Sequence, residues 1–187
     1  IDHLRFGLAL GFPSCCVDFF RRFNDWNRYS HPAETLRNTP KITGKAKGSY
    51  YCNNFLMDNT FFFIHNLPCS YRCEKTIEYA KRLEAEFREV EPEFAEKTAG
   101  LLKKPLLVFG ERNFVLFDGE YSDEEIKYRD CYYNQNPARA EESVGFFDEI
   151  QKGDRVSLKE GKLNIYKGDK LLRSIEKKEQ WFLMGWD

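Results

Sequence analysis

The sequence predicts an α+β fold: a helical, cysteine-bearing N-terminal half followed by a β-meander with one helix. Apolar residues recur at helical spacing up to about Leu102, whereas short alternating runs separated by turn residues follow Pro105. The chain has 187 residues, enough for one large domain or two small ones. We therefore expect a helical region over 1–104 and a β-rich region over 105–187, which could share one core.

The first half contains four helix signals. Ile1–Leu10 reads as a short helix ended by Gly11, and Pro13 suits the first turn of the next helix because it lacks an amide hydrogen. The polar stretch Asn24–Ser49 predicts a long loop with one helical turn near residues 32–37. Ile77, Ala80, Leu83 and Val90 repeat at helical spacing over Ser70–Val90, and Pro92 begins another helix that ends near Leu102.

The second half reads mainly as strands. Two apolar runs flank Gly110–Asn113 and predict a hairpin, Ile126–Tyr133 predicts a further strand, and Arg139–Ile150 predicts the single helix. Three short strands then follow, separated by Gly-containing turns: Val156–Leu158, Leu163–Tyr166 and Leu171–Ile175. Local pairing of successive strands would give a meander.

Composition and charge exclude few classes of protein function. The formal net charge is −1, so the overall balance does not demand nucleic acid or an anionic membrane as a partner. No apolar run approaches the length of a membrane-spanning helix, and no secretory signal pattern is visible. We therefore expect a cytoplasmic protein whose six cysteines are reduced thiols rather than a disulfide framework.

Four of the cysteines lie in two short sequence motifs that each place thiols beside a proline. The first motif is Gly11-Phe12-Pro13-Ser14-Cys15-Cys16, and the second runs from His65 through Pro68 and Cys69 to Cys73. Each proline marks an expected helix start, where backbone amides and the helix dipole favour a thiolate. We therefore expect Cys16, Cys69 and Cys73 to converge and to bind either an iron–sulfur cluster or zinc.

The fourth ligand is open at this stage. Cys52 lies between the two motifs and is our first choice. Cys15 should project away from Cys16 on a helix. His65 would suit zinc as a ligand, or could support a ligand from outside the first coordination sphere. An iron–sulfur cluster with three cysteines would need no fourth ligand from the protein. The alternative to a metal is a redox protein or enzyme that uses Cys69 and Cys73 as free thiols; the spacing predicts no reaction.

The two motifs also resemble those of a largely archaeal family, domain of unknown function four-eight-three. The resemblance rests on Gly11–Phe20 and His65–Cys73 and covers about the first half of the chain. It implies a prokaryotic intracellular protein and brings no activity with it.

A basic loop gives the second functional hypothesis. Residues 21–47 carry seven Arg and Lys against two acidic residues, with aromatic rings interleaved. A solvated loop would look the same, but phosphate contacts and base stacking use this mixture. We therefore predict an anionic ligand or RNA near the thiols, with Arg37, Lys41, Lys45 and Lys47 as the anion-binding candidates.

Overall fold

The computed structural model describes residues 2–23, 31–40, 47–110, 113–122, 124–134 and 144–187. The described residues up to Lys103, together with Trp186 and Asp187, form one compact unit, which we call the N-terminal unit. The described residues from Lys104 to Gly185 form a second, which we call the sheet unit. Among the described helices, none combines the length and the apolar character that a bilayer-spanning segment needs.

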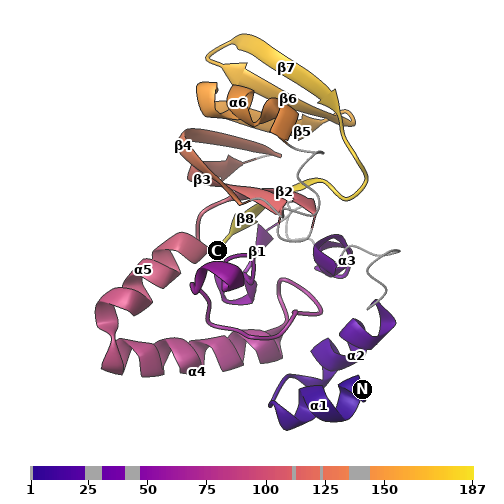
Figure 1. The fold of residues 1–187 in the computed structure, drawn as a ribbon, viewed down its shortest axis with the longest axis vertical. Coiled ribbons are helices and arrows are strands. Elements are labelled where there is room, and N and C mark those ends of the chain that lie inside the picture. The colour runs from indigo at the N-terminus through magenta and orange to yellow at the C-terminus, as the bar shows by residue number, and fades with distance from the viewer. Residues whose placement is uncertain (1, 24–30, 41–46, 111–112, 123, 135–143) are drawn as a thin grey trace. The chain divides into compact units, whose positions relative to one another are not determined.

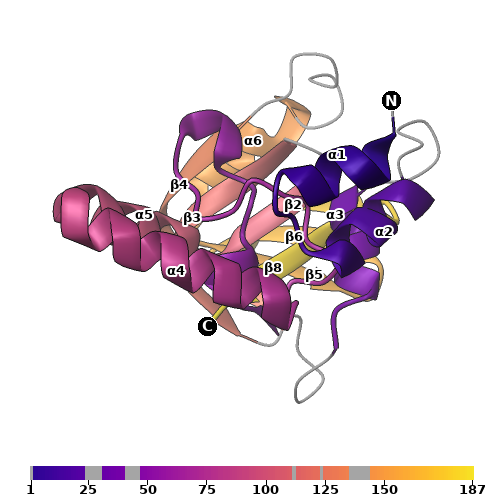
Figure 2. The same ribbon diagram turned by 90° about the horizontal axis from the view of Figure 1, so that it is seen from below.

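The N-terminal unit is built from short helices (Figure 1). In chain order they are α1 (His3–Ala9), α2 (Ser14–Arg22), α3 (His31–Arg37), the single 3₁₀ turns η1 (Tyr50–Cys52) and η2 (Met57–Asn59), α4 (Glu74–Val90) and α5 (Pro92–Leu102). The predicted end of the first helix is confirmed, since Gly11 adopts a left-handed φ of 77° just beyond α1. This turn lets α2 fold back beside α1, as Figure 2 shows.

Within the described residues, the sheet unit contains strands and one helix. The described strands of both units are β1 (Lys47–Gly48), β2 (Leu106–Gly110), β3 (Asn113–Ser122), β4 (Glu125–Asn134), β5 (Arg155–Lys159), β6 (Lys162–Lys167), β7 (Lys170–Glu176) and β8 (Phe182–Trp186). Helix α6 (Val144–Lys152) buries Phe146 and Ile150 in a core with Phe109, Phe117 and Trp181. The predicted hairpin around residues 110–113 is confirmed, because β2 and β3 pair antiparallel with Leu107 opposite Val115.

The predicted fold, a helical N-terminal half followed by a β-meander with one helix, is wrong. The strands form one eight-stranded sheet in the order β1-β8-β2-β3-β4-β5-β6-β7, so the last strand pairs with β2 instead of β7. Strand β1 comes from the first half of the chain, and helices, which make up 41% of the described residues, are scattered along it. Hydrogen bonds from Asp187 N to Gly48 O and from Tyr50 N to Asp187 O are those of a parallel pair, so the sheet is mixed.

The error has a physical cause. All five residues of β8 are buried, so this strand has no alternation of apolar and polar side chains to reveal it. Alternation also reports that a segment is extended, without saying which strand it will pair with. The sheet order therefore depends on long-range pairing that no local pattern records.

Candidate metal centre

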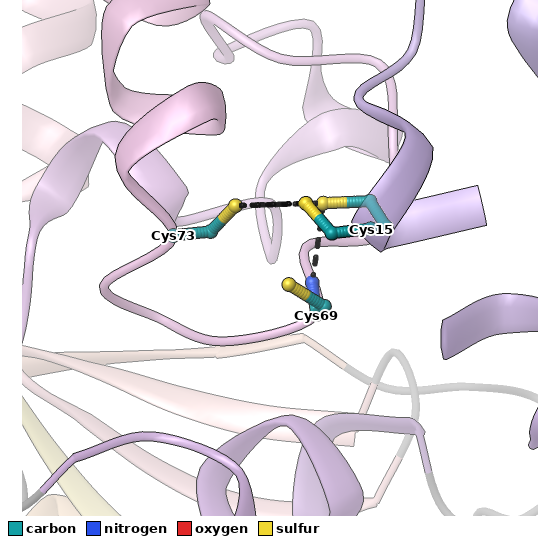
Figure 3. Close-up of side chains that lie close together, drawn as sticks. Cys15, Cys69 and Cys73 are labelled. Carbon is teal, nitrogen blue, oxygen red and sulfur yellow. Dashed lines mark hydrogen bonds between the residues drawn. The ribbon is translucent and has the colours of Figure 1, made fainter. Parts of the chain in front are cut away.

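Four sulfur atoms come together in the N-terminal unit. The Sγ atoms of Cys15, Cys16, Cys69 and Cys73 all lie within 4.8 Å of one another and could hold a metal ion. The Cys73 sulfur is 3.7 Å from that of Cys15 and 3.7 Å from that of Cys16. Figure 3 shows Cys15, at the start of α2, and Cys73, just before α4, pointing toward each other, with Cys69 on the chain that leads to Cys73.

Helix α2 supplies two of the four sulfurs from its first turn. The Pro13 carbonyl accepts hydrogen bonds from Cys16 N at 2.9 Å and Val17 N at 3.1 Å, which starts the helix. Val17 and Phe19 are buried and hold α2 in the unit. The adjacent cysteines can share one site because they sit in the first turn of α2, where a ligand can lie off the N-terminal end of the helix instead of along one face.

The other two sulfurs lie on the segment before α4. This helix begins at Glu74, with Cys73 as its N-cap, four residues later than the predicted start at Ser70. The positive ends of α2 and α4 therefore both lie at the sulfurs, an arrangement that stabilises negative charge.

Helix α3 and the residues after it hold the segment that contains Cys69. The Thr35 hydroxyl donates to Pro68 O at 3.0 Å, and Asn38 Nδ2 donates to Cys69 O at 2.6 Å. Thr39 Oγ1 accepts a hydrogen bond from Tyr71 N at 2.9 Å. These contacts fix the backbone on both sides of Cys69, so its sulfur is positioned by the surrounding structure as well as by any bound ion.

Donors surround the Cys16 sulfur. Cys69 N donates to it at 3.4 Å, and the Thr76 hydroxyl lies 3.3 Å away. Such donors support a thiolate and its bond to a metal.

Without a cation, four thiols this close cannot all ionise. Hydrogen bonds from Cys16 and Cys69 lower the pKa of Cys73, while the bonds that Cys69 makes to Cys16 and Cys73 raise the pKa of Cys69. Negative charge on one sulfur therefore opposes ionisation of the next. A bound divalent ion removes this conflict, because a coordinating thiol is deprotonated outright.

The structure brings the three expected cysteines together and adds Cys15, whose role the spacing left open. Cys52 is fully buried on η1, where its sulfur lies 3.9 Å from Cys73 O outside the four-sulfur group. His65 is exposed, and its ring packs edge-on against Phe62 at 4.6 Å. Thr76 went unnoticed in the sequence, although a hydroxyl three residues after a ligating cysteine is a signal that could have found it.

The anion-binding candidates are placed only in part. The Arg37 guanidinium forms an ion pair with Glu34, so an anion would have to compete with that carboxylate. Lys47 lies on β1, where its carbonyl accepts a hydrogen bond from Arg72 Nε at 3.0 Å. Lys41 and Lys45 lie outside the described residues. Binding of RNA or another anion therefore stays a prediction.

Comparisons of the chain with known protein families, with curated proteins and with solved structures give no match. The resemblance of its two cysteine motifs to domain of unknown function four-eight-three therefore stays a prediction.

Proposed function

We propose that Cys15, Cys16, Cys69 and Cys73 bind one tetrahedral zinc ion, which organises the N-terminal unit. A metal–sulfur bond of about 2.3 Å in a tetrahedron sets the sulfurs roughly 3.8 Å apart. The Cys73 sulfur lies 3.7 Å from the Cys15 sulfur and 3.7 Å from the Cys16 sulfur, which matches this edge. This agreement is the observation that carries the proposal.

The sulfur spacing also bears on the choice between zinc and an iron–sulfur cluster. In a cluster the four thiolates are divided among two or four iron atoms, so thiolates on different irons must stand further apart than on a single ion. The sulfurs here already lie within 4.8 Å of one another, which leaves room for one ion. Tetrathiolate sites suit zinc, and four protein ligands close its coordination shell, as in structural zinc sites.

Metal analysis of protein purified anaerobically under reducing conditions tests the proposal. We expect about one zinc per chain and no acid-labile sulfide, and cobalt substitution should give the absorption bands of tetrahedral thiolate coordination. Detection of iron together with acid-labile sulfide would show that the site binds an iron–sulfur cluster and not zinc. A protein free of metal would favour the free-thiol alternative.

Cys52→Ser provides a matched control for the ligand variants. Cys52 is as buried as Cys16 but lies outside the four-sulfur group. We expect Cys16→Ser and Cys73→Ser to lose most of the bound zinc, whereas Cys52→Ser should retain it. Equal loss in all three would mean that the variants act through folding and would remove the ligand assignment.

A further inference from the structure

The four sulfurs divide into a buried pair and an accessible pair. Cys16 is 2% exposed and Cys73 is 8% exposed, whereas Cys15 and Cys69 are only partly buried. The difference follows from their positions, because Cys16 and Cys73 lie on the inner sides of their helix ends. A reagent from solvent therefore meets Cys15 or Cys69 first.

A pocket of about 510 Å³ lies against the accessible pair. Its walls include Cys15 and Cys69, with Phe19 and Arg22 from α2 and Asn38 from the segment after α3. Cys16 and Cys73 do not line it. Small molecules can thus reach one edge of the centre while the other edge stays covered.

Hydrogen bonding separates the sulfurs in the same way. Cys16 has the Cys69 amide and the Thr76 hydroxyl beside it, and donors of this kind reduce the nucleophilicity of a thiolate. Within the described part of the chain, the hydrogen-bond contact of the Cys15 sulfur is with the Cys73 sulfur. Cys15 is therefore more accessible and less hydrogen-bonded than Cys16.

We propose that Cys15 is an oxidation site for small uncharged hydroperoxides, which enter through this pocket and release the metal. The inference rests on the proposed zinc site. Four thiolates around one divalent ion carry a net charge of −2, which disfavours anionic reagents and leaves a neutral peroxide as the better match.

The chemistry balances in two steps. The Cys15 thiolate attacks one oxygen of hydrogen peroxide, expels hydroxide and becomes a sulfenic acid. The Cys73 thiolate, 3.7 Å away, then attacks the Cys15 sulfur, expels a second hydroxide and forms a disulfide. Peroxide is reduced by two electrons, the two thiolates are oxidised by two, and zinc loses two of its four ligands.

Peptide mapping during peroxide treatment tests the order of reaction. The zinc-loaded protein carries Cys131→Ser, because Cys131 is also partly exposed. A chromogenic chelator follows zinc release while trapped sulfenic acids and disulfides are located by mass spectrometry. We expect sulfenic acid at Cys15 first, then a Cys15–Cys73 disulfide in step with zinc release. Initial oxidation at Cys16, Cys69 or Cys73 would overturn the proposal.

Two neighbouring arginines give a matched pair of variants that leave the ligands intact. Arg22 lines the pocket, whereas Arg21, at the same exposed end of α2, does not; Arg21 pairs at 3.6 Å with Asp18, which is itself part of the pocket wall. Arg22→Trp should fill the pocket and slow oxidation and zinc release severalfold, and Arg21→Trp should leave both rates near those of the parent protein. Equal rates in the two variants would contradict entry through the pocket.

Zinc content measured before peroxide is added keeps the two proposals apart. A reduced protein without metal would overturn the proposed function. The order of oxidation among the four thiols would still test whether Cys15, on the accessible edge, reacts first. A zinc protein that oxidises at Cys16 first would leave the proposed function standing and overturn only this inference.

Discussion

Thr76 contributes to the centre at the scale of a single hydroxyl group. It is fully buried in the first turn of α4, with its Oγ1 atom 3.3 Å from the Cys16 sulfur. Partners that hydrogen-bond to metal ligands typically change metal affinity by about 10–100-fold. We therefore expect Thr76→Val, which keeps the shape and removes the donor, to weaken zinc binding by about that factor in a chelator competition assay.

Thr98→Val is the matched control for this prediction. Thr98 is also fully buried, on α5, and within the described part of the chain its hydroxyl has no hydrogen-bond partner. Its replacement should leave zinc affinity unchanged, and because it removes a buried polar group without a partner it should not lower stability. Equal weakening of zinc binding in both variants would show that a buried methyl-for-hydroxyl exchange, and not the sulfur contact, is responsible.

Glu84 gives a second prediction at the residue scale. This carboxylate on α4 is only 6% exposed and accepts hydrogen bonds from Tyr51 at 2.6 Å and from Arg88 at 2.7 Å. Burial opposes its ionisation, but the hydrogen bonds from Tyr51 and Arg88 outweigh this and lower the pKa of Glu84. Glu84→Gln should therefore cost about 1.5–3 kcal/mol of unfolding free energy at neutral pH. Both carboxylate oxygens of Glu84 accept hydrogen bonds, and in glutamine one of them becomes an NH2 group that cannot accept.

The pH dependence of that loss has a definite sign. A carboxyl whose pKa is lower in the folded protein stabilises it above the unfolded pKa, about 4.3 for glutamate, and loses this contribution as the pH falls through the folded value. The stability difference between the parent protein and Glu84→Gln should thus be constant near neutral pH and shrink below about pH 4.3. Denaturant titrations at several pH values measure it, and a difference that grows on acidification would contradict the assignment.

At the scale of elements, the contact between α1 and α2 sets the position of Cys15 and Cys16. A Cβ atom added at Gly7 of α1 would lie 2.8 Å from Val17 Cγ2, and Val17 is a buried, β-branched residue of α2. Overpacking costs about 1–3 kcal/mol, which exceeds or offsets the helix propensity of about 1 kcal/mol that alanine gains over glycine. We expect Gly7→Ala to lower the thermal midpoint and to weaken zinc binding.

Gly100→Ala separates packing from helix propensity. Gly100 lies within α5, and nothing stands within 4 Å of the place its Cβ would occupy, so alanine should raise stability there by about 0.5–1 kcal/mol. Adding Val17→Ala to Gly7→Ala should partly restore the stability and the zinc binding that Gly7→Ala loses, because it removes the colliding methyl groups. Independent, additive effects at positions 7 and 17 would contradict the close contact of α1 and α2.

The same elements show what the sequence can and cannot predict. Gly11 and Pro13 mark the turn between α1 and α2 because their backbone requirements are local, and Pro13 correctly places Cys16 at a helix start. Pro68 does not mark a helix start, because α4 begins only at Glu74, after both Cys69 and Cys73. The role of Cys15 could not be predicted in this way, since it depends on a ligand that lies off the N-terminal end of α2. The contacts of α3 with the Cys69 segment, and the pairing of β8 with β2, join residues far apart in the chain and leave no local signal.

At the scale of the whole molecule, the metal should stabilise one unit and not the other. The four cysteines all belong to the N-terminal unit, whereas the sheet unit has its own core, with Phe117, Ile126, Ile150 and Leu163 among its buried residues. Binding to the folded state stabilises only what unfolds with the site. Chelation should therefore increase amide hydrogen exchange in α2 and at the start of α4, and leave the amides of β3 and β4 protected.

A variant at the C-terminal end of α4 is the control for the cysteine variant, and restoring zinc is the control for damage by the chelator. Val90, the last residue of α4, is 76% exposed, so Val90→Ser should leave zinc content and the response to chelation unchanged. Restoring zinc should reverse the exchange pattern in the parent protein, whereas Cys73→Ser should show the chelated pattern from the start. If β3 and β4 lost protection together with α2, the stabilising effect of the metal would extend through the whole chain, and its confinement to the N-terminal unit would be wrong.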